Sequence, residues 1–316
     1  MVLLVQKFAK FYSKLESHHH QTRHESEEQE LSSSLDAFRS ETSKFIGQLG
    51  LDLKPGSELL SFSWIQKCFG LLPFIHKAFA KLVVDIDYPV SKWEADSIEG
   101  YLRYSLTLLD LINSISSSLS HLGQSRLSLS HGLSLLENSS SLAMKHLKAI
   151  EPGKFTVKFD KEAHPEADDG EARIFSGKEG IVHEAVEEMK RISFWVCEIL
   201  LSGLCSDAKP YLEMRKIISG FDSSLIFKLD SKLSALLMEK KPVLKEVKEL
   251  NDDIAHLLVA SDTVKHEVVK ELQRKLQVFE KLLDDLSKEV NDLFGKVMTQ
   301  RTELVDCCRL SKQRQK

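Results

Sequence analysis

Towards the end of the chain, apolar residues recur at alternating spacings of four and three, and this repeat restricts the possible folds more than any other feature. One run covers 243–268 and a second covers 276–297, and they join through two successive spacings of four. Such a repeat lies on one face of a helix, and the junction is a stutter that locally unwinds a left-handed coil. The pattern predicts a coiled coil over 243–305, within or between chains. It forms either one long helix or a hairpin whose second helix begins at Asp262 or Thr263.

The composition favours helices elsewhere as well. Gly and Pro make up 21 of 316 residues, about half the usual share, so tight turns are few. With 42% hydrophobic and 28% charged residues, the chain can bury a sizeable core. We therefore predict an all-α fold, an extended helical bundle that ends in a long coiled-coil-like helix or hairpin.

Five segments follow from changes in charge and periodicity. Residues 1–16 form a basic amphipathic helix, and the polar residues 17–34 are predicted to be a flexible linker. Residues 35–150 form an N-terminal helical region, and residues 179–316 form a C-terminal one. Between them, residues 151–178 are predicted to be an acidic flexible loop, because this stretch is rich in acids, Pro and Gly.

Local signals give helix boundaries within the N-terminal region. Pro73 should kink or break the helix over 58–84, because proline lacks the backbone N–H that a helix interior needs. Ser91 and Glu94 have the spacing of a capping box, which predicts that Ser91 begins the next helix. That helix should end near residue 120, and a second one should cover 122–150.

No motif in the sequence points to catalysis, a cofactor or a metal. The phosphate-binding loop, the dinucleotide-binding glycine motif and the nucleophile elbow are all absent. His183 and Glu184 begin like a zinc-protease motif, but the required second histidine is replaced by Glu187. The pair Asp85 and Asp87 is expected to be a solvated loop pair. The histidines His18, His19, His20 and His24 could chelate a metal, but a solvated linker is the favoured interpretation.

Five cysteines without a CxxC pair argue against a disulfide framework or a structural zinc site, and they favour a reducing compartment. The net charge of −4 gives no basic footprint for nucleic acid, so no nucleic-acid partner is predicted. The most apolar stretch, 192–205, is too short for a membrane span and contains Glu198. A buried core helix is the favoured prediction, and a single-pass span is the alternative.

The two ends of the chain suggest contact with a membrane surface. Adjacent cysteines beside a basic tail suit reversible acylation, and basic side chains are attracted to anionic lipid. One acyl chain anchors weakly, so the basic N-terminal helix would supply the second signal. The alternative is a pair of ordinary thiols near a frayed helix end. The residues concerned are Cys307 and Cys308 for acylation, and Lys7, Lys10, Lys14, Arg309, Lys312, Arg314 and Lys316 for membrane-surface contact.

Several long blocks resemble the plant BYPASS-related family. They are VVDIDYPVSKWE at 83–94, the leucine- and serine-rich 101–139, AVEEMKRISFWVCEILLSGL at 185–204, and LFGKVMTQRTELVD at 293–306. The resemblance implies a land-plant protein with no known enzymatic chemistry, in a family associated with restraining a root-derived mobile signal that controls growth. It also implies exocyst subunits as partners of some relatives. It supplies no catalytic residues.

Two kinds of function remain at this point. The favoured one is a non-enzymatic cytoplasmic adaptor that binds helical partners near a membrane and that could also self-associate. The alternative is a carrier or enzyme for a small apolar metabolite, with a site between helices that no linear motif records. For that alternative, the titratable groups of first interest are His76, His121, His131 and His183.

Overall fold

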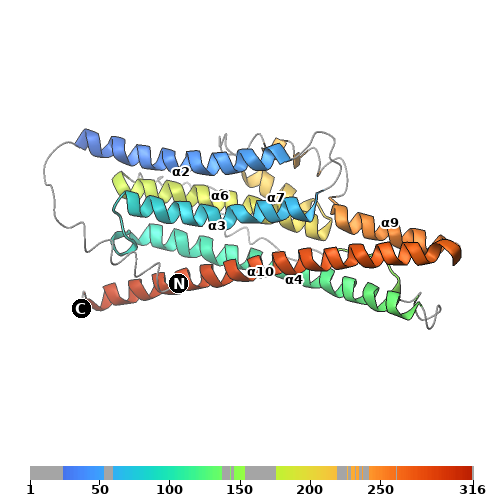
Figure 1. Cartoon of the computed structure of the whole chain (residues 1–316). Coiled ribbons are helices and arrows are strands. Elements are labelled where there is room, and N and C mark those ends of the chain that lie inside the picture. Colours follow the sequence, from blue (N-terminus) through green and yellow to red (C-terminus); the bar gives the residue numbers. More distant parts are fainter. Residues whose placement is uncertain are drawn as a thin grey trace.

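A computed structural model describes residues 24–52, 60–136, 143, 146–153, 176–218, 226, 229–231, 233–234, 237, 242–260 and 262–314. Over these residues the fold is all-α, as predicted, with one isolated bridge between Leu60 and Leu244. The helices, shown in Figure 1, are α2 (His24–Asp52), α3 (Phe62–Asp85), the short 3₁₀ helix η1 (Val90–Lys92), α4 (Ala95–Leu135), α6 (Gly177–Cys205), α7 (Lys209–Ile218), α9 (Lys245–Val259) and α10 (Asp262–Arg314).

Helix α6 lies at the centre of the bundle. Helices α2, α3, α4 and α7 all pack against it, and Figure 1 shows α2 on one side and α4 with α10 on the other. As a result, every residue of 192–205 is buried, Glu198 included. The apolar stretch is therefore a core helix, as the sequence favoured. Within the described part of the chain, no helix combines the length and apolar character that crossing a bilayer requires.

Helices α4 and α10 are long and pack against each other. With 41 and 53 residues they extend past the other helices. Near one end Arg301 donates to the backbone carbonyl of Leu102, and further along Arg126 pairs with Glu280 at 2.9 Å, so the two helices run antiparallel. At the far end the bundle thins to the last part of α4, α9 and the first part of α10, as Figure 1 shows. We call this part the three-helix end.

The C-terminal repeat folds as a hairpin rather than as one helix. Helix α9 ends at Val259, and the second helix begins at Asp262, one of the two predicted starts. Ala260 has an extended backbone, which lets the chain reverse. An ion pair of 2.7 Å between Asp253 and Lys275 then ties α9 to α10.

Two predicted boundaries were wrong because tertiary packing outweighed the local signal. Helix α4 does not end near residue 120, since its buried leucines carry the helix through Gly123 at a cost of only about 1 kcal/mol. At Pro73 the sequence predicted a kink or a break, and helix α3 continues through Pro73 without a break. The predicted linker 17–34 is helical from His24 onwards, because Leu31 is buried and extends the apolar stripe of α2.

The predicted capping box was also wrong. The Lys92 N–H donates to the Pro89 carbonyl at 2.8 Å, so Ser91 lies inside the turn of η1. The residue that precedes α4 is instead Glu94, whose side chain makes no cap hydrogen bond. Helix α4 therefore begins at Ala95, later than the capping box predicted.

Candidate functional site

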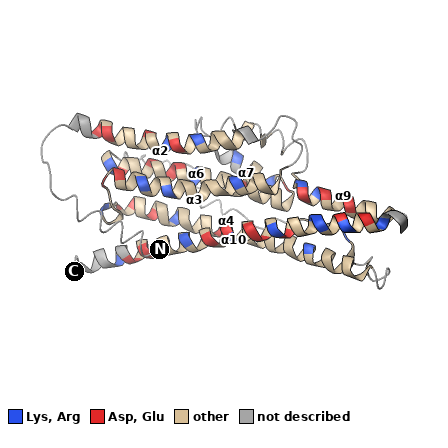
Figure 2. Cartoon of the chain, in the orientation of Figure 1, with Lys and Arg blue, Asp and Glu red and all other residues tan. Residues whose placement is uncertain are grey.

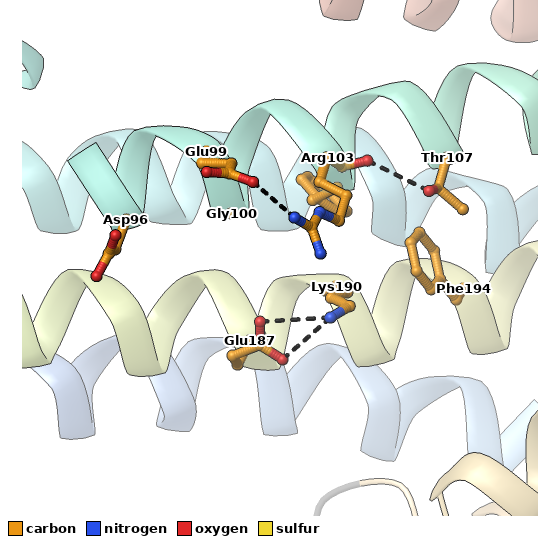
Figure 3. Close-up of a pocket in the computed structure, with 9 residues that line it drawn as sticks. Asp96, Glu99, Gly100, Arg103, Thr107, Glu187, Lys190 and Phe194 are labelled. Carbon is orange, nitrogen blue, oxygen red and sulfur yellow. Dashed lines mark hydrogen bonds and ion pairs between the residues drawn. The ribbon is translucent and has the colours of Figure 1, made fainter. Parts of the chain in front are cut away.

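A groove opens between α4 and α6, and we call it the α4–α6 groove. Its volume is about 240 Å³, and Figure 3 shows the side chains around it. Tyr104 and Phe194 are buried at the groove, with rings 5.9 Å apart. Gly100 leaves open space where any other residue would place a side chain. A glycine inside a helix costs stability, so this one is a sequence signal for the groove.

Charged side chains from both helices line the groove. Arg103 pairs with Glu99 on α4 at 2.6 Å, and Lys190 pairs with Glu187 on α6 at 3.4 Å. Figure 3 shows Arg103 and Lys190 approaching each other from opposite sides. With Asp96 the lining carries three acids and two bases, so a polar or weakly cationic group fits the rim and an apolar body fits the two rings.

A buried polar network lies directly beneath the groove. The Tyr104 hydroxyl is 2.8 Å from Nε2 of His76 and 3.0 Å from Oγ of Ser193. Burial lowers the pKa of His76 to about 4, although a hydrogen bond with Gln300 opposes the shift. Burial likewise raises the pKa of the Tyr104 hydroxyl. Both groups are neutral near pH 7, so the network is a hydrogen-bonding core feature and a poor general base.

A second buried cluster lies where α6 meets α7, and no sequence motif predicted it. The carboxylate of Asp230 accepts hydrogen bonds from Nε1 of Trp195 at 3.0 Å, from the Tyr211 hydroxyl at 2.5 Å and from Nε of Arg215 at 3.2 Å. Burial and the neighbouring carboxylate raise the pKa of Tyr211. A carboxylate with three donors is a structural anchor rather than a reactive group.

Glu198 lies in the same part of the core, but the described residues donate no hydrogen bond to its carboxyl group. Neither of its carboxyl oxygens has a hydrogen-bond partner among the described residues. Burial, with a contribution from the negative charge of Glu213, raises the pKa of Glu198 to about 8. The group is therefore mostly protonated at neutral pH, which is how a lone buried carboxyl is tolerated.

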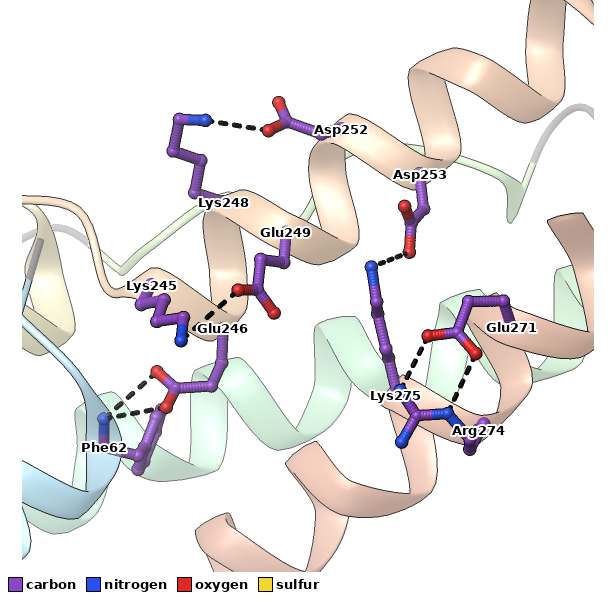
Figure 4. Close-up of polar contacts among 10 residues, drawn as sticks. All are labelled: Phe62, Lys245, Glu246, Lys248, Glu249, Asp252, Asp253, Glu271, Arg274 and Lys275. Atoms are coloured by element: carbon purple, nitrogen blue, oxygen red, sulfur yellow. Dashed lines mark hydrogen bonds and ion pairs between the residues drawn. The ribbon is translucent and has the colours of Figure 1, made fainter.

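Helix α9 is fixed to the bundle by polar contacts, and Figure 4 shows the one between Glu246 and Phe62. Both carboxylate oxygens of Glu246 accept from the Phe62 N–H, at 3.2 and 3.0 Å, and so cap the first turn of α3. The side chain of Asn251 accepts from the Ile150 N–H at 2.7 Å and donates to its carbonyl at 3.1 Å. Residues far apart in sequence thereby hold α9 in one place.

The three-helix end exposes large apolar side chains. Val259 is 84% exposed and Leu258 is 44% exposed at the apex of the hairpin, and Leu127 and Val278 are exposed on α4 and α10. Around them, cations and anions are interspersed along α9 and α10, as Figure 2 shows. We take this apolar apex with its polar surround as a candidate protein-binding surface.

Of the membrane-contact residues predicted at the two ends, the structure describes the side chains of Cys308 and Arg309. Cys308 is half-buried and packs against the core, so its acylation would require the end of α10 to move. Arg309 is exposed, 3.7 Å from Asp306. Cys307, Lys312 and Arg314 lie on α10 but their side chains are outside the description. Also outside the described residues are Lys7, Lys10, Lys14, Lys316 and the histidines His18, His19 and His20.

The candidate histidines do not form one site. His76 lies in the core network, and Nε2 of His121 is 3.0 Å from the Glu151 carbonyl oxygen. His131 contacts the ring of His146, and His183 is half-buried on α6. Within the described ranges, no group of three or more donor side chains could hold a metal ion.

Parts of the chain match curated plant proteins. UPF0496 protein 4 of Oryza sativa subsp. japonica is 27% identical over 179 residues, which is 51% of this chain and 39% of that protein. The indica protein of the same name is 36% identical over 103 residues, 32% of this chain and 23% of that protein. Protein BPS1, chloroplastic, of Arabidopsis thaliana is 38% identical over 87 residues, 28% of this chain and 25% of that protein. The chain therefore spans less than half of each relative. No family model and no solved structure matches it.

Proposed function

We propose that this chain, which belongs to the plant BYPASS-related family, is a non-enzymatic regulatory adaptor that binds helical partners through its three-helix end. The observation that carries the proposal is the exposure of Val259 and Leu258 at the apex of the α9–α10 hairpin. We place this adaptor in the regulation of a root-derived mobile signal that controls growth, because the family resemblance implies that process.

The geometry of the apex suits an amphipathic helix as partner. Such a helix lays its apolar face against an exposed apolar surface, and Val259 with Leu258 offers that surface. Glu246 and Asn251 already fix α9, so little conformational entropy remains to be lost when a partner binds. Among helical partners we place exocyst subunits first, because the family resemblance implies them.

Replacing Leu258 and Val259 together with aspartate should weaken binding of purified exocyst subunits to the full-length chain at least tenfold. Losing one buried aliphatic side chain costs about 1.5–3 kcal/mol, and every 1.4 kcal/mol is a factor of ten. Biolayer interferometry gives the dissociation constants. Leu106→Asp is the matched control, since Leu106 is 50% exposed on α4, away from the apex. Unchanged binding by the double variant, or no binding of any subunit to the wild type, would contradict the proposal.

Peripheral membrane contact is part of the same proposal, with a cytoplasmic location. It would use the helix predicted from the sequence over residues 1–16 and the tail at Cys307 and Cys308. The full-length chain should float with anionic vesicles at low salt. Flotation should fall at high salt, which screens the lysines, or after hydroxylamine, which removes a thioester-linked acyl chain. Flotation that resists both treatments, or none at any salt, would count against this anchor.

The α4–α6 groove favours a second function, the binding of a small apolar molecule with a polar or cationic group. Gly100→Phe should fill the groove, because the position opens into free space. Denaturing mass spectrometry of the purified protein should then lose a molecule that co-purifies with the wild type. Gly123→Phe is the control, an equally open glycine on the same helix outside the groove. A molecule retained by Gly100→Phe, or absent from the wild type, would refute this function.

A further inference from the structure

Two histidines come into ring contact at the three-helix end. His131 lies on α4 and His146 on the segment that returns along it, with ring centroids 4.8 Å apart and ring planes at 79°. His131 is exposed and His146 is half-buried, so solvent reaches the pair. We propose that His131 and His146 together bind one divalent transition-metal ion of the Cu²⁺ or Zn²⁺ type.

The ring separation agrees with shared coordination. A metal lies about 2.0–2.1 Å from an imidazole nitrogen, hence about 3.2 Å from each ring centroid. Two imidazoles bound at a ligand angle of about 90–109° then have centroids about 4.5–5.2 Å apart. The observed 4.8 Å falls within that interval. Rotation about the last side-chain torsion, which is broad for histidine, turns one nitrogen of each ring towards the shared position.

The backbone around the pair is held by close contacts. A Cβ added at Gly132 would lie 2.9 Å from the Cβ of His146, so the returning segment touches α4 directly beside His131. Asn251 fixes Ile150 a few residues further on, and His121 contacts the carbonyl of Glu151. The two imidazoles are therefore brought together by the fold rather than by chance rotamers, which lowers the entropy lost on binding.

The donor set defines the class of ion. Imidazole suits Cu²⁺, Ni²⁺ and Zn²⁺ better than Mg²⁺ or Ca²⁺, and Cu²⁺ binds most tightly of the first-row divalent ions. Water completes the coordination sphere, since no third donor side chain joins the pair among the described residues. A bound ion would link α4 to the segment that Asn251 holds, and so stabilise the end of the molecule that carries the exposed apex.

The test uses the full-length chain with His18, His19, His20 and His24 replaced by asparagine, because those side chains could chelate metal by themselves. Titration of this parent protein with Cu²⁺ should show one site by calorimetry and two nitrogen ligands by electron paramagnetic resonance. Saturating Cu²⁺ should also raise its melting temperature. His131→Asn and His146→Asn should each weaken binding at least tenfold and remove the thermal shift. His183→Asn, on α6 and outside the contacts that hold the pair, should change neither.

Two outcomes would overturn the site. One is a parent protein that no longer binds Cu²⁺, which would assign metal binding to the N-terminal histidines alone. The other is equal affinity in the parent, His131→Asn and His146→Asn, which would place the metal elsewhere. Circular dichroism of each metal-free variant shows that it is folded, so loss of binding is not mistaken for loss of structure.

Discussion

Asp230→Ala is expected to lower the free energy of unfolding by about 3–5 kcal/mol, the usual cost of removing one partner from a buried charged network. Asp230 accepts from the Trp195 indole, the Tyr211 hydroxyl and the Arg215 guanidinium. Trp195 and Tyr211 are fully buried, so both donors would be left without an acceptor. An unpaired buried donor costs about 1–3 kcal/mol.

Urea unfolding followed by far-UV circular dichroism measures the loss. Asp230→Asn should cost less, because the amide oxygen can still accept from Trp195 and Tyr211. Asp252→Ala is the surface control, since Asp252 forms an exposed ion pair with Lys248 at 2.8 Å. Pairs of that kind contribute about 0–1 kcal/mol. If Asp230→Ala and Asp252→Ala destabilised the protein equally, Asp230 would not anchor α6 to α7.

Stability should fall as the pH rises from 6.5 to 8, and Glu198 should be the cause. The pKa of Glu198 rises from its usual 4.5 to about 8 in the folded protein. Between those values the folded chain holds a proton that the unfolded chain has lost, so stability decreases by about 1.4 kcal/mol per pH unit. His76 affects stability at lower pH, because its pKa falls from 6.5 to about 4 in the folded protein. Its contribution to the free energy of unfolding is present above pH 6.5 and is lost as the pH drops towards 4.

Unfolding free energies at pH 6.5 and 8 therefore isolate Glu198 from His76. The wild type should lose about 2 kcal/mol over this interval from the Glu198 proton alone. Glu198→Gln cannot ionise and should remove that part of the pH dependence. A slope that is the same in the wild type and in Glu198→Gln would show that the carboxyl is hydrated in the folded protein.

Much of the fold could be predicted because it depends on periodicity along single segments. The burial of 192–205 followed from the short length of the stretch and its internal Glu198. The start at Asp262 was one of two starts predicted for a hairpin, itself one of two alternatives. Boundaries failed where a distant helix decided the outcome. Gly123 and Pro73 stay helical because their helices are packed over their whole length, and packing on other helices is not visible in a local window.

The candidate sites were less predictable for the same reason. Asp230 looks like any surface acid in the sequence, and only the fold brings Trp195 and Tyr211 to it. The α4–α6 groove has one indication in the sequence, the glycine Gly100 inside a helix. That glycine indicates a groove only once the facing helix is known. The pairing of His131 with His146 required the close approach of two backbones at Gly132, which no spacing rule predicts.

The cap that Glu246 places on α3 has a consequence for the newly made chain. Phe62 is synthesised 184 residues before the carboxylate that accepts its N–H. At about 5–20 residues per second, a ribosome needs roughly 10–40 s to cover that distance. Helix α10, which covers α4, emerges later still. During this interval the N-terminal half exposes apolar surface that the finished protein buries. We therefore expect a chaperone to bind the growing chain.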